Sequence, residues 1–472
     1  MNLDQLRKQA KELVKAARAA DDDALARLGG RDARLASAQL VLAREHGYPS
    51  WAALVHALEA NEAAFVLAAT DGRRARAEAL LAARPELARA PWARLVLGRG
   101  WDGDANEPGG PRGWAPLVYV CHSCFPSVEL ARDLLDRGAD PNAFFVNEHG
   151  RMSALYGAAG RAHDPALTRL LLERGANPND GESLYHACEA DTAECVRLLL
   201  DAGAETRNTN ALPHALDFEH TLEHVRRLLE HGADPNEGAF VAHAVRRGRG
   251  PDFVRLLAEH GADVDRPGGE TWRGAVPLRS PYRHALLRNR ADVAAALAEL
   301  GADTTVPTDD LAVAAVARGE APPVPLPAEL DPDAQEVLIL AALEGRLDAV
   351  VAAVGADFAG VVGGSPTGTL LHHAAWIGRP DLVRRLLELG ADPAPESPAE
   401  FSTPLAWAAL ASREDSLPGR DYVAVAELLV AAGNRLEPRF FDVADGRLAA
   451  WLEERLAGAH PNRGSPSARP GE

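Results

Sequence analysis

One unit recurs along most of this 472-residue chain: a leucine-rich stretch that ends in Gly-Ala-Asp or a close variant. Leucines three or four residues apart give a helix one apolar face, and the glycine permits the left-handed turn that ends it. The stretch Val225–His231, followed by Gly232, is typical of the unit. The glycines that mark it are Gly138, Gly175, Gly203, Gly232, Gly261, Gly301, Gly355, Gly390 and Gly433.

A shorter helix is expected before each long one, and several of these share a His-Ala step. Small residues after the step, such as Ala374 and Ala375, let two helices approach closely. A two-helix unit cannot bury its apolar face alone and must stack on its neighbours, so the pattern predicts an all-α solenoid. Packing and hydrogen bonds between repeats are favoured over pH sensing as the role of these histidines. They are His186, His214, His243, His284 and His373.

The clearest copies of the unit are Thr369–Gly378, continuing to Leu389–Pro393, and Thr403–Ala409. These segments resemble ankyrin repeats, whose first helix opens with Thr-Pro-Leu-His, although the histidine here tends to lie one place later. The resemblance implies an all-α ankyrin-repeat solenoid. It also implies a non-catalytic interaction module or scaffold, which binds another protein on its concave face and finger loops.

Repeats and prolines together predict the domain organisation. Residues 38–51 resemble a helical lead-in found before some bacterial ankyrin arrays, which suggests an N-terminal helical cap. Val306–Asp333 contains six prolines, so helix stacking should weaken there around one short helix, Leu311–Gly319. The predicted segments are the cap, 1–59; a first array, 60–304; a Pro-rich break with a degenerate repeat, 305–334; a second array, 335–456; and a disordered tail, 457–472.

Charge and composition exclude several classes of function. The formal charge of −18, from 50 basic and 68 acidic residues, argues against nucleic acid as a partner. Four cysteines supply no disulfide framework, and residues 1–8 are too charged for a signal peptide. The longest uncharged run, Phe358–Gly378, is broken by Gly-Gly-Ser-Pro and is no membrane span. We therefore expect a cytoplasmic protein of bacterial type without a cofactor, and its oligomeric state stays open.

One string suggests catalysis instead. His220, Glu223 and His224 match the H-x-x-E-H zinc pattern, in which two histidines on one helix face hold a metal. A metal-dependent hydrolase is therefore the alternative function, although a histidine at the start of a long helix also fits the repeat. Cys121 and Cys124 form a C-x-x-C pair, but no second close pair accompanies it, which favours buried structural cysteines.

A basic stretch gives the local hint of a binding surface. Between Arg246 and Arg290 ten arginines face five acidic residues, a local charge of +5. Arginine and tryptophan commonly anchor interfaces, so a partner with an acidic surface is expected, with an acidic polymer as the other possibility. A solvated arginine-rich face is the simpler interpretation. The candidate contacts, placed by the repeat register, are Arg247, Arg249, Arg288, Arg290, Trp376 and Trp407.

Overall fold

The computed structural model divides the chain into two compact units, Met1–Glu237 and Gly238–Glu472. The predicted tail, 457–472, lies outside the described residues, as does the segment 270–277 within the basic stretch. The structure describes residues 3–48, 51, 54, 61–269, 278–355, 362–363, 368–395, 403–414, 420–436, 444, 447–449, 451–452 and 455.

Three helices at the start of the chain pack against one another around their own small core. Ala10, Leu13 and Leu28 are among its buried residues. The Asp21 carboxylate accepts a hydrogen bond from the Ala24 N–H at 2.8 Å and so caps the second helix. These helices are α1 (Leu3–Arg18), α2 (Asp22–Leu28) and α3 (Leu35–Glu45).

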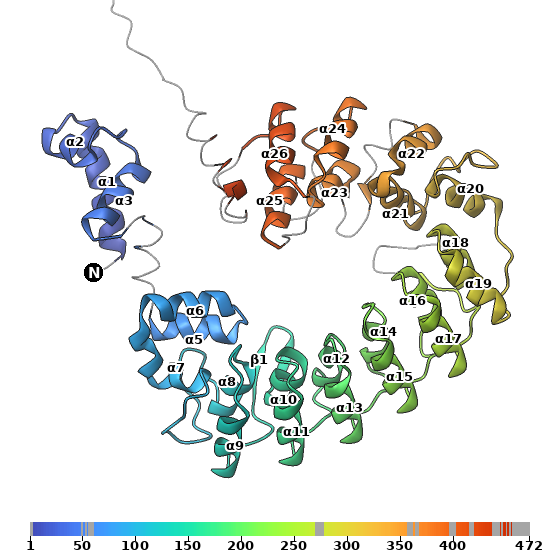
Figure 1. Ribbon diagram of the computed structural model, residues 1–472, viewed down its shortest axis with the longest axis horizontal. Coiled ribbons are helices and arrows are strands. Elements are labelled where there is room, and N and C mark those ends of the chain that lie inside the picture. The colour runs from blue at the N-terminus through green and yellow to red at the C-terminus, as the bar shows by residue number, and fades with distance from the viewer. Residues whose placement is uncertain are drawn as a thin grey trace, which may run out of the picture. The chain divides into compact units, whose positions relative to one another are not determined.

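The rest of the first unit is a stack of paired helices. In successive pairs the first helices lie side by side along one face and the second helices along the other (Figure 1). At Gly157 a Cβ would lie 2.8 Å from the Cys121 carbonyl oxygen, so glycine permits this close approach. The elements are α5 (Glu62–Thr70), α6 (Arg74–Ala83), the 3₁₀ helix η1 (Pro85–Arg89), α7 (Pro91–Val96), α8 (Pro116–His122), α9 (Val128–Asp136), α10 (Ala154–Tyr156), the π-helical turn η2 (Gly157–Arg161), α11 (Pro165–Glu173), α12 (Ser183–Ala187), α13 (Glu194–Asp201), α14 (Ala211–Ala215) and α15 (Leu222–Glu230).

Asparagines join the loop of one pair to the loop of the next. The Asn142 side chain donates to the Gly175 carbonyl oxygen at 3.1 Å and accepts from the Asn177 N–H at 2.7 Å. Asn179 repeats both contacts one pair further on, at 3.1 Å with Gly203 and 2.8 Å with Glu205. The repeat spacing therefore sets one neutral contact between successive loops.

The second unit continues the pattern through the Pro-rich segment. Val313 and Val316 of that segment join the same buried core as Leu287 before it and Val337 after it. The Pro-rich segment therefore contributes a helix to the core, and the two compact units divide at Glu237 instead. The helices are α16 (Phe240–Arg246), α17 (Pro251–Glu259), α18 (Pro281–Leu287), α19 (Ala291–Glu299), α20 (Thr308–Ala317), α21 (Pro332–Ala341), the π-helical turn η3 (Ala342–Arg346), α22 (Leu347–Val354), α23 (Leu370–Trp376), α24 (Pro380–Glu388), α25 (Pro404–Glu414) and α26 (Tyr422–Ala431).

The predicted helical class is confirmed, with two short antiparallel hairpins added to it. β1 (Phe144–Asn147) pairs with β2 (Gly150–Ser153), and β3 (Val362–Gly363) pairs with β4 (Gly368–Thr369). Each hairpin precedes the first helix of a pair. None of the helices in the described part of the chain has both the length and the apolar character that crossing a membrane requires.

Candidate functional site

The arginines at the end of α16 differ in exposure. Arg247 is exposed, directly after the helix. Arg249 is only 6% exposed, and its guanidinium donates to the Arg247 carbonyl oxygen at 2.6 and 3.2 Å. It also lies over the Phe253 ring, 6.0 Å from the centroid. Burial leaves Arg249 little surface to offer a partner.

The two arginines predicted after α18 also have contacts within the chain. Arg288 Nη2 lies 2.6 Å from a carboxylate oxygen of Asp333. Arg290 donates to the Gly248 carbonyl oxygen at 2.5 Å and pairs with Asp292 at 3.1 Å. These contacts tie neighbouring repeats of the second unit together.

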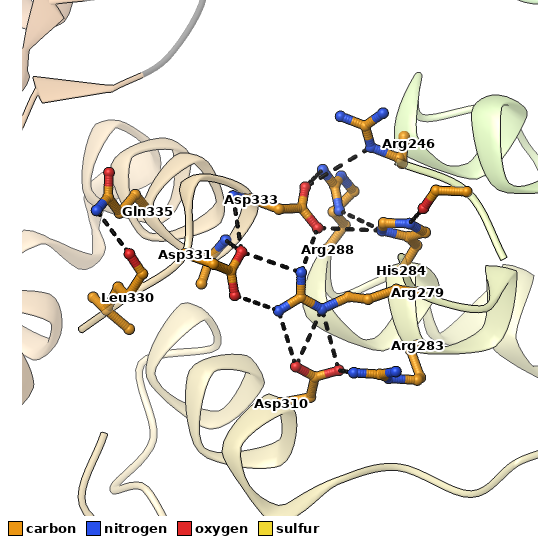
Figure 2. A network of polar contacts seen from close by, with 12 residues as sticks. Arg246, Arg279, Arg283, His284, Arg288, Asp310, Leu330, Asp331, Asp333 and Gln335 are labelled. Atoms are coloured by element: carbon orange, nitrogen blue, oxygen red, sulfur yellow. Dashed lines mark hydrogen bonds and ion pairs between the residues drawn. The ribbon is translucent and has the colours of Figure 1, made fainter. Parts of the chain in front are cut away.

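Arg288 belongs to a buried cluster of charges that joins the basic stretch to the Pro-rich segment (Figure 2). Arg279 lies at its centre, 3.1 Å from Asp310, 2.7 Å from Asp331 and 3.2 Å from Asp333. Arg279 and Asp333 have side chains that are 4% and 1% exposed. The whole set, here called the buried charge cluster, is Arg246, Arg279, Arg283, His284, Arg288, Asp310, Asp331 and Asp333.

The acids of the cluster are held ionised. Burial alone would raise the pKa of Asp333, but the His284 hydrogen bond and the Arg288 charge outweigh it and hold the pKa far below its ordinary value. The pKa of Asp331 is likewise lowered, because the Arg279 hydrogen bond outweighs burial. Burial lowers the pKa of His284 more than its bond to Asp333 raises it.

The cluster changes the interpretation of the basic stretch. Arg279, Arg283 and Arg288 meet carboxylates of the same chain, so a large part of the local positive charge is neutralised internally. The sequence pattern could not reveal this, because the acids lie 27 to 54 residues further along the chain. An acidic polymer would find fewer available guanidinium groups here than composition suggests.

The two predicted tryptophans lie together in the second unit. Trp407 is 2% exposed, and its ring packs against His372 at 5.0 Å and against Trp376 at 5.9 Å between centroids. Trp376 is half-buried at the end of α23, and its carbonyl oxygen accepts from the Tyr422 hydroxyl at 3.0 Å. Trp407 is therefore a core residue, whereas Trp376 keeps an exposed part.

The H-x-x-E-H string does not gather into a metal site. His220 is exposed and precedes α15, whereas His224 lies inside that helix and is 1% exposed. Glu223 lies 2.8 Å from Arg227 and 3.5 Å from Arg226, so its carboxylate is engaged by cations. Among the described residues this string is absent from the His, Cys, Asp and Glu groups close enough to share an ion. The geometry gives the hydrolase hypothesis no support.

The C-x-x-C cysteines differ in burial. Cys121 is buried, whereas Cys124 is partly buried. Burial raises the pKa of both thiols, most strongly that of Cys121, which disfavours the thiolate that a nucleophile or metal ligand needs. The predicted structural role agrees with this burial.

Sequence analysis missed a run of touching rings in the first unit, here called the ring row. Neighbouring ring centroids are 3.8 to 6.3 Å apart. Tyr156, Tyr185 and Phe218 are half-buried, so each also has an exposed part. An aromatic residue directly before the Gly-Ala or His-Ala step, as at Tyr156 and Tyr185, was the signal that could have revealed it. The row comprises Trp101, Trp92, Tyr119, Trp114, Phe145, His122, Tyr156, His186, Tyr185, His214, Phe218, His220 and His224.

The first hairpin adds exposed apolar surface beside this row. Phe145 of β1 stacks on Trp114 with 4.0 Å between ring centroids. Its neighbours Phe144 and Val146 are 43% and 68% exposed. Because alternate strand residues point to opposite faces, one side of β1 joins the ring row and the other faces solvent.

Comparison with known proteins identifies the repeats. A model of ankyrin repeats in three copies matches residues 155–239, and a single ankyrin-repeat model matches residues 368–396. Two solved structures are similar to the chain. One is the ankyrin repeat domain of Bcl-3, described as a unique member of the IkappaB protein family, at 25% identity over 38% of this chain and 82% of that one, with a TM-score of 0.30. The other is the human ASB11 ankyrin repeat domain, at 17% identity over 65% of this chain and 94% of that one, with a TM-score of 0.21. No curated protein matches the chain.

Proposed function

Starting from a chain that contains ankyrin repeats, we propose that this protein is a non-catalytic module that binds another protein. Stacked repeats of this kind expose a long surface, and ankyrin repeats typically serve in protein–protein interaction. The residues that suggested catalysis are exposed, paired with arginines or buried without convergence, so binding is the function that the geometry supports best.

The observation that carries the proposal is the ring row together with hairpin β1–β2. Aromatic side chains are enriched among the residues that dominate interface energetics, since they bury large areas with few rotatable bonds. Only 5% of the residues are aromatic, yet the first unit gathers many of them in one row. Phe144 and Val146 supply the solvent-facing apolar side chains next to it. We place the main contact of the partner there.

Arg247 and Trp376 remain proposed contacts in the second unit, because both keep exposed surface. Arg249, Arg288, Arg290 and Trp407 are better explained by the internal contacts described above. The partner is therefore expected to present apolar groups to the first unit, and an acidic surface is no longer its main requirement.

The test is a paired substitution on the exposed side of the hairpin. Phe144→Asp/Val146→Asp removes apolar surface from solvent-facing positions and leaves the core unchanged. A partner captured from native lysate with the wild-type chain should bind the purified variant at least tenfold more weakly, which corresponds to about 1.4 kcal/mol.

Leu340→Asp is the matched control, because Leu340 is also an exposed apolar residue, at 45%, and lies in the second unit. It should bind like the wild type in the same titration. Equal affinity of the hairpin variant and the wild type would remove the proposed surface.

A further inference from the structure

Two histidines from neighbouring repeats and one glutamate converge in the first unit. His186 lies on α12, Glu189 in the turn after it, and His214 on the adjacent α14 (Figure 1). His186 Nδ1 is 2.7 Å and His214 Nε2 is 3.0 Å from the same carboxylate oxygen of Glu189. One such atom from each of the three residues lies within 4.8 Å of the others. Repeat stacking, and not local sequence, brings His214 to the other two.

Each imidazole also turns its second nitrogen toward another carboxylate. His186 Nε2 is 3.4 Å from Glu182, and His214 Nδ1 is 3.6 Å from Asp217. A neutral imidazole carries a single N–H and cannot donate to two carboxylates at once. Each ring therefore places a lone pair beside a carboxylate unless a cation, either a proton or a metal ion, lies there.

We propose that His186, Glu189 and His214 bind one divalent transition-metal ion of the zinc type. His186 would ligate through Nδ1 and His214 through Nε2, both as neutral imidazoles. Their opposite N–H groups would then donate to Glu182 and Asp217. Metal-ligating histidines commonly donate the other N–H to a carboxylate in this way, which orients the ring and raises its basicity.

The distances suit such an ion. Zinc bonds of about 2.0–2.1 Å in a tetrahedron hold the ligand atoms about 3.3 Å apart. The observed 2.7 and 3.0 Å need to lengthen by only a few tenths of an ångström, which side-chain rotation supplies. Tyr185 stacks on His214 with 3.8 Å between centroids and limits the motion of that ring.

The site is also accessible. The side chains of His186, Glu189 and His214 are 27%, 33% and 14% exposed, so an ion can enter. Three protein ligands leave a fourth position for water or for a side chain of another molecule. The inference does not depend on the proposed partner surface, because the ligands all come from this chain.

Calorimetric titration of the metal-free full chain with zinc chloride tests the proposal. The wild type should bind one ion per chain at this site. His214→Ala and Glu189→Gln should each weaken that binding about 100-fold or more, and Asp217→Asn about tenfold, as for a residue that orients a ligand. His243→Ala is the control, since His243 occupies the same His-Ala step on α16 and should leave the affinity unchanged.

Circular dichroism of each variant separates a lost ligand from a lost fold, and Glu189→Gln keeps the side-chain shape. Zinc should raise the melting temperature of the wild type and not that of His214→Ala. Equal zinc affinity of the wild type and His214→Ala would overturn the proposal. Absence of binding by the wild type at millimolar zinc would overturn it too, because the three residues would then be only a hydrogen-bonded link between repeats.

Discussion

The regular repeats of the first unit and the Pro-rich segment of the second are held together by different chemistry. Between successive loops of the first unit, Asn142 and Asn179 make the same pair of neutral hydrogen bonds at partly exposed positions. Across the Pro-rich segment, Arg279 instead joins Asp310, Asp331 and Asp333 in a buried ionic cluster. Regular spacing lets one weak contact recur, whereas an irregular connection depends on a few strong ones.

Burial explains why the second arrangement is fragile. Charges taken out of water are stable together only if each has its partners, so removing one leaves the others uncompensated. The neutral hydrogen bonds of the first unit have no such dependence, because water can replace a lost partner at the surface. The comparison therefore predicts a large difference in how the two regions tolerate substitution.

The largest expected effect is in the buried charge cluster. Asp333→Ala leaves Arg288 and Arg279 with less compensation in a buried place, so the free energy of unfolding should fall by about 3–5 kcal/mol. Chemical denaturation followed by circular dichroism measures it. Asp309→Ala, an exposed acid on the same segment, should change stability by less than about 0.5 kcal/mol. Similar losses from the two variants would contradict the special role of the cluster.

Acid should weaken the same region. The pKa values of Asp331 and Asp333 are lowered in the folded state, so the unfolded state binds more protons. Their contribution is present above the unfolded pKa of about 3.9 and is lost as the pH falls below it, by up to about 1.4 kcal/mol per pH unit for each group. Denaturation series between pH 6 and pH 2 measure this slope. It should be shallower for Asp333→Asn, and an unchanged slope would show that Asp333 does not contribute.

The neutral contacts should give a smaller effect. Asn179→Ala removes its bonds to the Gly203 carbonyl oxygen and the Glu205 N–H, which should cost about 1 kcal/mol. Asn179→Asp keeps the acceptor and loses only the donor, so its loss should be intermediate. Denaturation midpoints of the three proteins give the comparison. A loss as large as that of Asp333→Ala would erase the distinction between the two regions.

An exposed ion pair of the second unit should matter least. Arg255 and Glu299 lie 3.1 Å apart, with side chains 43% and 69% exposed. Exposed pairs contribute little because water and salt screen them, so Arg255→Ala should change the free energy of unfolding by about 0.5 kcal/mol or less. The measurement is the same denaturation experiment. A loss of several kcal/mol would mean that burial does not decide which ion pairs stabilise this protein.

The sequence pattern predicted the features that depend on local spacing. Gly175 and Gly203 end their helices with φ of 90° and 91°, as the repeat required. Arg288 could not be assigned from sequence, because its partner Asp333 lies 45 residues away and burial of the pair depends on the fold. The His-Ala steps drew attention to His186 and His214, but no pattern indicated that Glu189 would lie between them.

Binding of one purified partner tests the central claim, that the first unit carries the contact surface while the arginines of the second hold its own fold. Three proteins are titrated: the wild type, Phe144→Asp/Val146→Asp and Arg247→Glu/Trp376→Ala. The account predicts the larger loss of affinity, at least tenfold, for the first-unit variant. Wild-type affinity for that variant, together with lost binding by the second-unit variant, would contradict it.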